Sequence, residues 1–291
     1  IPFTINGIGL IINMILDPLF IFIFDWKTDG AALATWLAQA CVFGLFIYQL
    51  KVKKILWEDF RFFGKLKKVH TTRIIKIGLP VATLNTLFAF VNMFLGRTAS
   101  TVGGHIGLMA MTTSGQIEAI TWNTSQGFST ALSAFVAQNY AAKKISRVMK
   151  ALKSTLFMTL IFGIFCSLLF IFWGNNIFAI FVPEREAYEA GGLALRIDGY
   201  SQLFMMLEIV IQGVFYGMGR TIPPAIISIS CNYLRIPMAF LFVSFGWGLS
   251  GIWWTICLTS IIKGIIILIW FLFIKRKTLD KMAIEEIHNI N

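Results

Sequence analysis

The sequence predicts an all-α protein that crosses a membrane several times. Hydrophobic residues make up 57% of the 291 positions, charged residues make up only 13%, and the mean hydropathy is +0.76. A typical soluble domain carries about 25% charged residues. The apolar residues also gather into stretches of about 20 residues, the length that a helix needs to cross a bilayer. These two observations together indicate a polytopic membrane protein.

Eight such stretches can be placed along the chain. The connections between them are mostly short, so consecutive helices are expected to be antiparallel neighbours. The fourth and sixth stretches are long and contain polar residues, which favours helices packed inside a bundle over lipid-facing helices. The predicted spans are 7–24, 31–50, 74–96, 106–138, 154–174, 191–218, 223–245 and 250–274.

The positive charges predict how these spans are oriented. If the spans alternate in direction, nineteen of the 25 Lys and Arg residues lie on one side of the membrane. Cytoplasmic loops carry the excess of Lys and Arg, so this side and the C-terminus are expected to be cytoplasmic. The asymmetry accounts for the net charge of +11 without a nucleic-acid partner. The basic side holds Lys51, Lys53, Lys54, Arg61, Lys65, Lys67, Lys68, Arg73, Lys76, Lys143, Lys144, Arg147, Lys150, Lys153, Arg220, Lys275, Arg276, Lys277 and Lys281.

The cysteines and histidines do not form a pattern typical of a metal site or a catalytic centre. Cys41, Cys166, Cys231 and Cys257 all fall within predicted spans and lack paired spacing, so they are expected to be small buried hydrophobes. The three histidines are too scattered to form a local cluster. No loop carries a nucleotide-binding or hydrolytic motif. We therefore expect neither an enzyme nor a bound cofactor.

An internal repeat relates the first two spans to the last two. The stretch "NMILDPLFIF" aligns with "NYLRIPMAFL" and places Asn13 over Asn232 and Pro18 over Pro237, at an offset of 219 residues. A two-residue slip later, the alignment pairs Phe24 with Phe245, Trp26 with Trp247 and Gly30 with Gly251.

The length of this period predicts the architecture of a larger protein. A period near 220 residues that spans six helices implies two six-helix halves, about 440 residues in all, related by an axis along the membrane normal. The chain opens without Met and enters a span almost at once. We therefore expect it to hold the last two helices of the first half and the whole second half.

A carboxylate in the first span is the leading candidate for an ion site. Asp17 stands in an apolar stretch, where a charge costs at least about 2.5 kcal/mol at mid-bilayer. The repeat has Ile236 at the equivalent position, so the fold does not need the acid. The alternative is structural: Asp17 is protonated, because apolar burial raises the pKa of a carboxyl group, or it pairs with a basic residue elsewhere.

The neighbours of Asp17 are oxygen ligands. Asn13 lies one helical turn earlier on the same face. Pro18 has no N–H, so a kink there is expected to free the carbonyl oxygen of Met14. Thr35 on the next helix is expected at a similar depth. Carboxylate, amide, hydroxyl and carbonyl oxygens suit Na⁺ or H⁺ rather than a soft metal.

Further polar residues recur in the second half at helical spacing. If their faces converge, they line a negatively charged cavity that suits an organic cation. Amides also often join transmembrane helices to one another without contacting substrate, and this alternative is the stronger one for the amides. Lys263 lies mid-span and could pair with Glu208 or Glu118, which would neutralise the cavity, whereas Arg235 is expected to be structural. The candidate cavity residues are Glu118, Glu208, Gln116, Asn123, Gln212 and Asn85.

Several motifs, in order along the whole chain, resemble one family of transporters. The runs "GLIINMILDPLFIF" and "GAALATWLAQ" resemble the fifth and sixth helices of the multidrug and toxic compound extrusion (MATE) family, and "GLPVATLNTLFAFVNMFLGR" resembles the seventh. The run "GFSTALSAFVAQNYAAKK" resembles the end of the eighth helix. "GVFYGMGRTIPPAIISI" and "NYLRIPMAFLF" resemble the junction between the tenth and eleventh helices and the eleventh helix itself.

This resemblance implies a twelve-helix exporter of cationic or amphipathic compounds, driven by Na⁺ or H⁺, whose two lobes rock to alternate access. One branch of the family has a cation site in its N-terminal lobe, and Asn13, Asp17 and Thr35 match three of its ligands. The fourth, an Asp on the first helix, has no counterpart here. Another branch uses an acid on the seventh helix, where this chain has Phe88, so the N-lobe site is favoured.

The resemblance also implies how the chain divides. Residues 1–50 correspond to the last two helices of the N-terminal lobe, and 51–73 to a basic cytoplasmic linker between the lobes. Residues 74–274 correspond to the C-terminal six-helix lobe and 275–291 to a cytoplasmic tail. We expect a monomer in the plasma membrane whose partners are the lipid bilayer and small organic cations or amphipathic drugs.

Two other functions stay open from the sequence. A lipid-linked precursor flippase of the same superfamily predicts a groove with several Arg and Lys residues, and here Arg235 and Lys263 stand within spans. An intramembrane enzyme needs facing carboxylates or a histidine near the membrane surface, which the scattered histidines do not supply.

Overall fold

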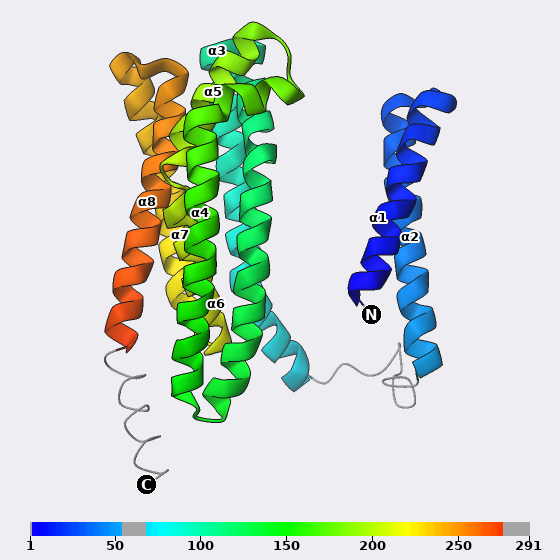
Figure 1. The fold of residues 1–291 in the computed structure, drawn as a ribbon, viewed down its shortest axis with the longest axis vertical. Helices are drawn as coiled ribbons and strands as arrows, with labels where there is room; N and C mark the ends of the chain where they lie inside the picture. The colour runs from blue at the N-terminus through cyan, green and yellow to red at the C-terminus, as the bar shows by residue number, and fades with distance from the viewer. Residues whose placement is uncertain (1, 54–67, 276–291) are drawn as a thin grey trace. The chain divides into compact units, whose positions relative to one another are not determined.

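The computed structural model describes residues 2–53 and 68–275, which form helices joined by short turns (Figure 1). No β-strand occurs within these residues, so the predicted all-α class is confirmed. The chain divides into two compact units, Ile1–Thr71 and Thr72–Asn291. Most of the predicted linker and tail lies outside the described residues, and the assignment of the units to two transporter lobes stays a prediction.

The first unit is a helical hairpin. Helix α1 (Pro2–Pro18) continues into a π-helical turn, η1 (Leu19–Ile23), and α2 (Lys27–Lys53) returns beside it (Figure 1). Because Pro18 has no N–H, it removes one backbone hydrogen bond at this point, and the wider π turn follows directly. The break predicted at Pro18 therefore takes the form of a change in helix type.

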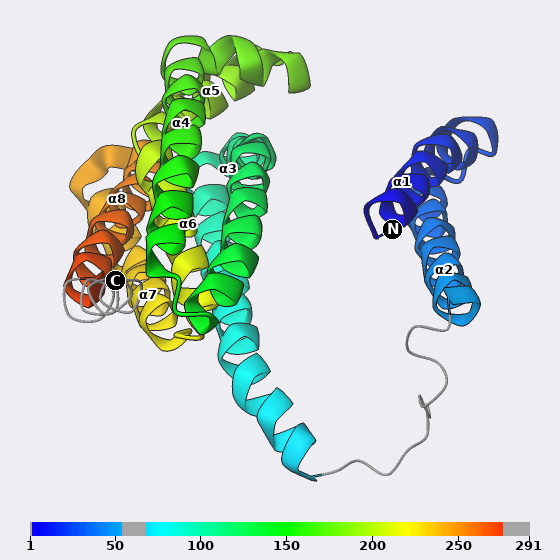
Figure 2. The same cartoon turned by 60° about the horizontal axis from the view of Figure 1, so that its bottom comes forward.

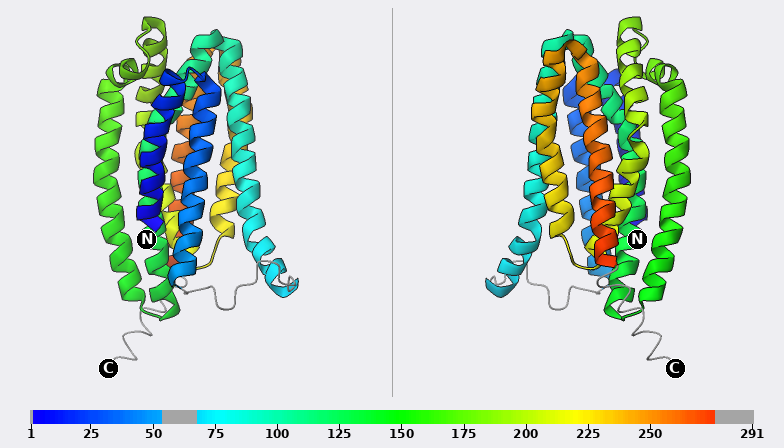
Figure 3. Two further views of the ribbon diagram at one scale, coloured as in Figure 1. Left: turned by 90° about the vertical axis from the view of Figure 1, so that its right-hand side faces the viewer. Right: turned by 90° about the vertical axis from the view of Figure 1, so that its left-hand side faces the viewer.

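The second unit is a helical bundle. Helix α4 packs against α5 and α6, and α8 packs against α5, α6 and α7. Figure 2 shows α5 against one end of α4, and Figure 3 shows α7 and α8 side by side. The elements are α3 (Lys68–Ala141), α4 (Ile145–Phe181), α5 (Arg185–Gly199), α6 (Gln202–Gly217), α7 (Ile222–Phe242), η2 (Val243–Trp247) and α8 (Gly248–Ile274).

A glycine divides α3 into two helical parts. Gly104 has φ of +61° and ψ of −144°, a conformation that side-chain-bearing residues avoid. This break falls between the predicted spans 74–96 and 106–138. Hydropathy predicted a turn between these two spans, and Gly104 can adopt the positive φ that this turn requires.

The sixth predicted span, 191–218, is not one continuous helix. It is divided between α5 and α6 at Tyr200 and Ser201. The hydroxyl of Ser201 donates to the carbonyl oxygen of Asp198 at 2.9 Å, and Ser167 on α4 donates to the carbonyl oxygen of Gly199. These serine hydroxyls satisfy carbonyls near the break, so the interruption does not leave them unpaired.

Helix α4 is longer than the predicted span 154–174. It has 37 residues, which is about 55 Å at 1.5 Å per residue. The hydrocarbon core of a bilayer is about 30 Å thick. The helix therefore extends beyond the core, and the difference arises because hydropathy marks the lipid-immersed part of a helix rather than its ends.

Four helical stretches of the described chain are long and apolar enough to cross a membrane. They are Phe3–Ile23, Lys27–Gln49, Ile145–Phe181 and Ile222–Ile274. The last contains α7 and α8, two predicted spans, which separate where Gly246 has a positive φ. The multi-pass membrane character is therefore supported, and the total of eight spans stays a prediction.

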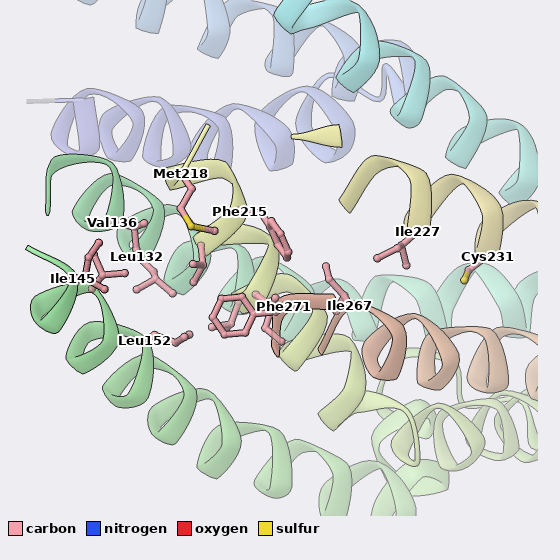
Figure 4. Close-up of a cluster of buried hydrophobic side chains, with 14 residues drawn as sticks. Leu132, Val136, Ile145, Leu152, Phe215, Met218, Ile227, Cys231, Ile267 and Phe271 are labelled. Atoms are coloured by element: carbon pink, nitrogen blue, oxygen red, sulfur yellow. The ribbon is translucent and has the colours of Figure 1, made fainter. Parts of the chain in front are cut away.

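The largest buried apolar cluster joins α3, α4, α6, α7 and α8 (Figure 4). Phe215 on α6 and Phe271 on α8 meet edge to face with ring centroids 6.1 Å apart. The cluster holds the bundle together and comprises Leu132, Val136, Ile145, Val148, Leu152, Val210, Ile211, Val214, Phe215, Met218, Ile227, Cys231, Ile267 and Phe271.

The turns of the two repeat-related hairpins have the same construction. In α1–η1–α2, Phe20 stacks on Trp26 with ring centroids 5.5 Å apart, and in α7–η2–α8, Phe242 stacks on Trp247 at 4.9 Å. A Cβ on Gly30 would lie 2.9 Å from the carbonyl oxygen of Phe20. A Cβ on Gly251 would lie 2.9 Å from Cβ of Phe242. Both hairpins thus combine a π turn, a stacked aromatic pair and a glycine at the close approach.

Candidate functional site

The first hairpin contains two buried polar atoms without partners. Nδ2 of Asn13 and Oδ1 of Asp17 are both buried, and neither has a hydrogen-bond partner among the described residues. The two residues lie one turn apart on α1, immediately before the π turn. A buried polar group without a partner is costly, so this pair marks a place where a bound ion or proton could lower the free energy.

The third predicted ligand lies across the hairpin on α2. The hydroxyl of Thr35 donates to the carbonyl oxygen of Ala31 at 3.0 Å, which leaves the lone pairs of its oxygen free to accept. Thr35 and Asn13 both line a groove of about 310 Å³ between α1 and α2. Asp17 lies one turn further along and is not part of its lining. The groove is lined by Asn6, Gly9, Leu10, Asn13, Thr35, Ala38, Gln39 and Val42.

Two polar residues of this lining were not predicted as site residues. Asn6 lies seven residues before Asn13, and Gln39 lies four residues after Thr35. Both spacings place the side chains on the same helix faces as the predicted ligands. Extending the helical spacing by one or two turns would have identified them.

The second unit contains a charged network around Glu208. Nζ of Lys263 on α8 lies 3.1 Å from Oε2 of Glu208 on α6, and Glu208 is only 4% exposed. Its other oxygen accepts from Gln212 at 2.8 Å and from Ser228 at 3.2 Å. Of the two partners considered for Lys263, the structure selects Glu208. The charge of this acid is therefore compensated within the bundle.

Glu118 belongs to a second network between α3 and α6. Its Oε1 accepts from Nε2 of Gln202 at 3.3 Å, and Oε1 of Gln202 accepts from the hydroxyl of Thr121 at 2.9 Å. Gln202 is fully buried, whereas Glu118 is partly exposed. Glu118 is thus oriented by Gln202, and part of its side chain remains exposed to a ligand.

A buried guanidinium lies between α7 and α8. Arg235 is 5% exposed and donates to the hydroxyls of Thr259 at 2.9 Å and Ser260 at 3.0 Å. Oδ1 of Asp198 is also buried and has no hydrogen-bond partner in the described part of the chain. Arg235 interacts electrostatically with Asp198 and with Glu118. The hydroxyl contacts of Arg235 agree with the structural role predicted for it.

The remaining cavity candidates are exposed amides on α3. Asn123 donates to the carbonyl oxygen of Ala119 at 2.7 Å, within its own helix. Gln116 and Asn85 are likewise exposed. Within residues 2–53 and 68–275, no hydrogen bond joins these amides to Glu118 or Glu208. The structure thus brings together Glu208 and Gln212 and leaves Gln116, Asn123 and Asn85 apart from them.

The sequence did not single out Gln202, Ser228 or Asp198. Gln202 and Ser228 provide the contacts that hold the two acids. Nothing in their local sequence distinguishes them from other polar residues of a membrane helix. Their importance arises from contacts between segments more than 15 residues apart along the chain.

Curated relatives align along almost the whole chain. A probable multidrug resistance protein NorM of Thermotoga maritima is 25% identical over 304 residues, which cover 98% of this chain and 63% of the relative. A multidrug export protein MepA of Staphylococcus aureus is 23% identical over 295 residues, covering 97% of this chain and 63% of the relative. The chain thus spans less than two thirds of the length of these relatives.

Solved structures share the fold. A MOP superfamily transporter from Pyrococcus furiosus, described as having a binding pocket of reversed polarity, matches with a TM-score of 0.81 at 20% identity, covering 95% of this chain and 62% of that one. An outward-facing MATE family multidrug resistance transporter matches with the same TM-score and identity, covering 94% and 61%. The model of the MatE family matches residues 79–241, more than half of the chain. The chain belongs to the MatE family of membrane transporters.

Proposed function

We propose that this protein is a cation-coupled antiporter that exports cationic or amphipathic organic compounds across the plasma membrane. Two curated relatives bear the names of multidrug resistance and multidrug export proteins. The observation that carries the proposal for this chain is the pair of unpartnered buried atoms on Asn13 and Asp17 beside a π turn. A coupled transporter needs a place where ion binding changes the free energy of one conformation relative to another.

The first hairpin supplies that place. A carboxylate that lacks a hydrogen-bond donor is stabilised when Na⁺ binds or a proton neutralises it. Asn13 and Thr35 offer further oxygen atoms, and the carbonyl oxygen of Met14 has no helical N–H opposite it because residue 18 is proline. These residues would hold the coupling ion, and either Na⁺ or H⁺ fits a hard oxygen set.

In the proposed mechanism, ion binding at Asp17 changes the conformation of the helix at the adjacent π turn. Asp17 and Pro18 stand directly before η1, where the helical hydrogen bonding changes register. Neutralising Asp17 would allow this segment to repack, because the cost of a charge in hydrocarbon is then removed. In the proposed cycle this repacking biases two six-helix lobes between inward-open and outward-open states, with substrate taken from the cytoplasm or inner leaflet.

Glu118 is the acid in the second unit that we assign to substrate. It is partly exposed and lies next to Trp122, which is 45% exposed and offers an aromatic face to an organic cation. Glu208 is bound to Lys263 and buried, so we assign it to holding α6 against α8. The eight-span topology, the cytoplasmic C-terminus and the monomeric state remain part of this proposal.

Efflux of ethidium from cells that express the full-length chain tests the proposal, with Na⁺ and pH varied separately. Asp17→Asn keeps the size of the side chain and removes its charge, and we expect it to abolish ion-dependent efflux. Asp29→Asn is the matched control, because Asp29 is an exposed acid at the start of α2. Efflux that survives Asp17→Asn unchanged would assign the aspartate a structural role.

The flippase alternative receives less support from the interior of the second unit. A pyrophosphate groove needs accessible cations, and both intramembrane cations are occupied: Lys263 by a carboxylate and Arg235 by two hydroxyls. Export of lipid-linked precursors without efflux of organic cations would reverse this preference.

A further inference from the structure

The exposed face of α4 carries basic side chains near its start and large apolar side chains along the rest of its length. Arg147 and Lys150 are exposed near the start of the helix, and apolar side chains follow on the same face. At 100° per residue these positions lie within one stripe, on the side of α4 away from the core. The apolar part of the stripe is Phe157 (68% exposed), Ile161 (55%), Phe165 (57%), Leu168 (47%) and Phe172 (67%).

The opposite face of α4 is committed to the bundle. Ile145, Val148 and Leu152 are at most 2% exposed and belong to the largest buried cluster, which Figure 4 shows between α4 and its neighbours. Because these residues anchor the first turns of the helix, Arg147 and Lys150 are directed away from the bundle at a defined position. The basic end of the stripe is thus held by a packed core.

Among the described residues, the basic side chains of this segment have no acidic partner. Residues 119–183 contain no Asp or Glu. Within the part of the chain that the structure describes, the ion pairs are Arg185 with Glu189 and Lys263 with Glu208. The exposed cations near the start of α4, none of which forms an ion pair with another described residue, are Lys143, Lys144, Arg147, Lys150 and Lys153. A group of like charges held this close attracts an anion of opposite charge.

The spacing along α4 matches a lipid molecule. Lys150 and Phe157 are seven residues apart, a rise of about 10 Å. A helix that is longer than the hydrocarbon core places its first turns at headgroup level, and the apolar stripe then lies beside the acyl chains. Cations above a continuous apolar stripe provide the two chemistries that an anionic phospholipid presents, a charged headgroup and a hydrocarbon tail.

We propose that the start of α4, with Arg147 and Lys150 at its centre, is a binding site for an anionic phospholipid whose acyl chain lies along Phe157 and Phe165. This site includes neither Asp17 nor Glu118, and the proposal does not depend on whether the protein exports drugs.

Lipid titration followed by native mass spectrometry tests the site. The purified protein in mild detergent is titrated with phosphatidylglycerol, with phosphatidylcholine, and with glycerol 3-phosphate, which has the charged group but no acyl chain. We expect retention of phosphatidylglycerol only. The variant Arg147→Gln/Lys150→Gln should weaken it by about thirtyfold, because each cation near a membrane surface contributes about 1 kcal/mol.

A matched double variant separates this site from general electrostatics. Arg97→Gln/Arg185→Gln removes the same number of exposed cations outside the α4 stripe and should leave phosphatidylglycerol retention unchanged. Equal retention by the α4 variant and the unmodified protein would overturn the proposal, and so would equal losses in the two double variants. Equivalent binding of glycerol 3-phosphate would also overturn it, since the ligand would then be a soluble phosphate.

Discussion

The hairpins α1–η1–α2 and α7–η2–α8 have turns of the same construction, but they differ in whether their charged side chains have partners. Each has a π turn, a stacked Phe–Trp pair at that turn and a glycine at the close approach. Asp17 of the first has a buried oxygen without a partner. In the second, Arg235 and Lys263 are both bound by protein side chains. The same backbone design therefore leaves an ion-binding opportunity in one hairpin and closes it in the other.

The aligned residues show where the difference arises. Asn13 and Asn232 are equivalent, and each has a buried amide atom without a hydrogen-bond partner among the described residues. At the next position on this face the first hairpin has Asp17 and the second has Ile236. The asparagine is thus common to both hairpins, and the carboxylate on which the proposed ion binding rests is present only in the first.

The largest effect is expected from breaking the compensation in the second hairpin. Lys263→Met leaves Glu208 buried without its cation, which costs about 3–5 kcal/mol in comparable buried pairs. Thermal unfolding of the purified protein measures the loss. The double variant Lys263→Met/Glu208→Gln should recover most of the lost stability, because Gln212 and Ser228 can still bond a neutral amide. A double variant as unstable as the single one would contradict a pairwise compensation.

The opposite change is expected in the first hairpin. Asp17→Leu removes a carboxylate that has one buried oxygen without a hydrogen-bond partner among the described residues, and introduces an aliphatic residue like Ile236 of the repeat. In a Na⁺-free membrane at neutral pH, we expect the free energy of unfolding to rise by about 2.5 kcal/mol. Ethidium efflux should be lost in the same variant. A variant that loses both stability and efflux would show that the hairpin needs the acid to fold.

The shared turn predicts similar, smaller losses in both hairpins. At Gly30 and Gly251 an added Cβ would lie 2.9 Å from its nearest atom, and backbone atoms of Phe20 and Phe242 are among its close neighbours. Gly30→Ala and Gly251→Ala should therefore each cost about 1–3 kcal/mol in thermal unfolding.

Gly44→Ala is the control for these substitutions. Gly44 lies on α2 with nothing within 4 Å of an added Cβ, and alanine there is expected to be neutral or slightly stabilising. A loss at Gly30 without a loss at Gly251 would show that the two turns are not equivalent.

Much of the fold could be predicted because membrane helices are encoded locally. Apolar stretches of sufficient length identified α1, α2, α7 and α8, and the repeat alignment identified the two related turns at Gly30 and Gly251. Asp17, whose Oδ1 is buried without a hydrogen-bond partner among the described residues, could be identified as a candidate because it is an acid in an apolar stretch. The membrane spans and the candidate acid follow from residues that are near one another in the chain, and the repeat follows from comparing two such local patterns.

The partners of the charged residues could not be predicted in this way. Lys263 had two candidate acids, and the choice of Glu208 depends on how α6 and α8 pack. The break at Ser201 depends on Ser167, a residue of another helix. The sequence by itself determined the all-α class, the approximate positions of most helices, the family and the unusual position of Asp17 in an apolar stretch. The tertiary structure decided which charges are compensated, because an ion pair depends on distances between segments that only packing brings together.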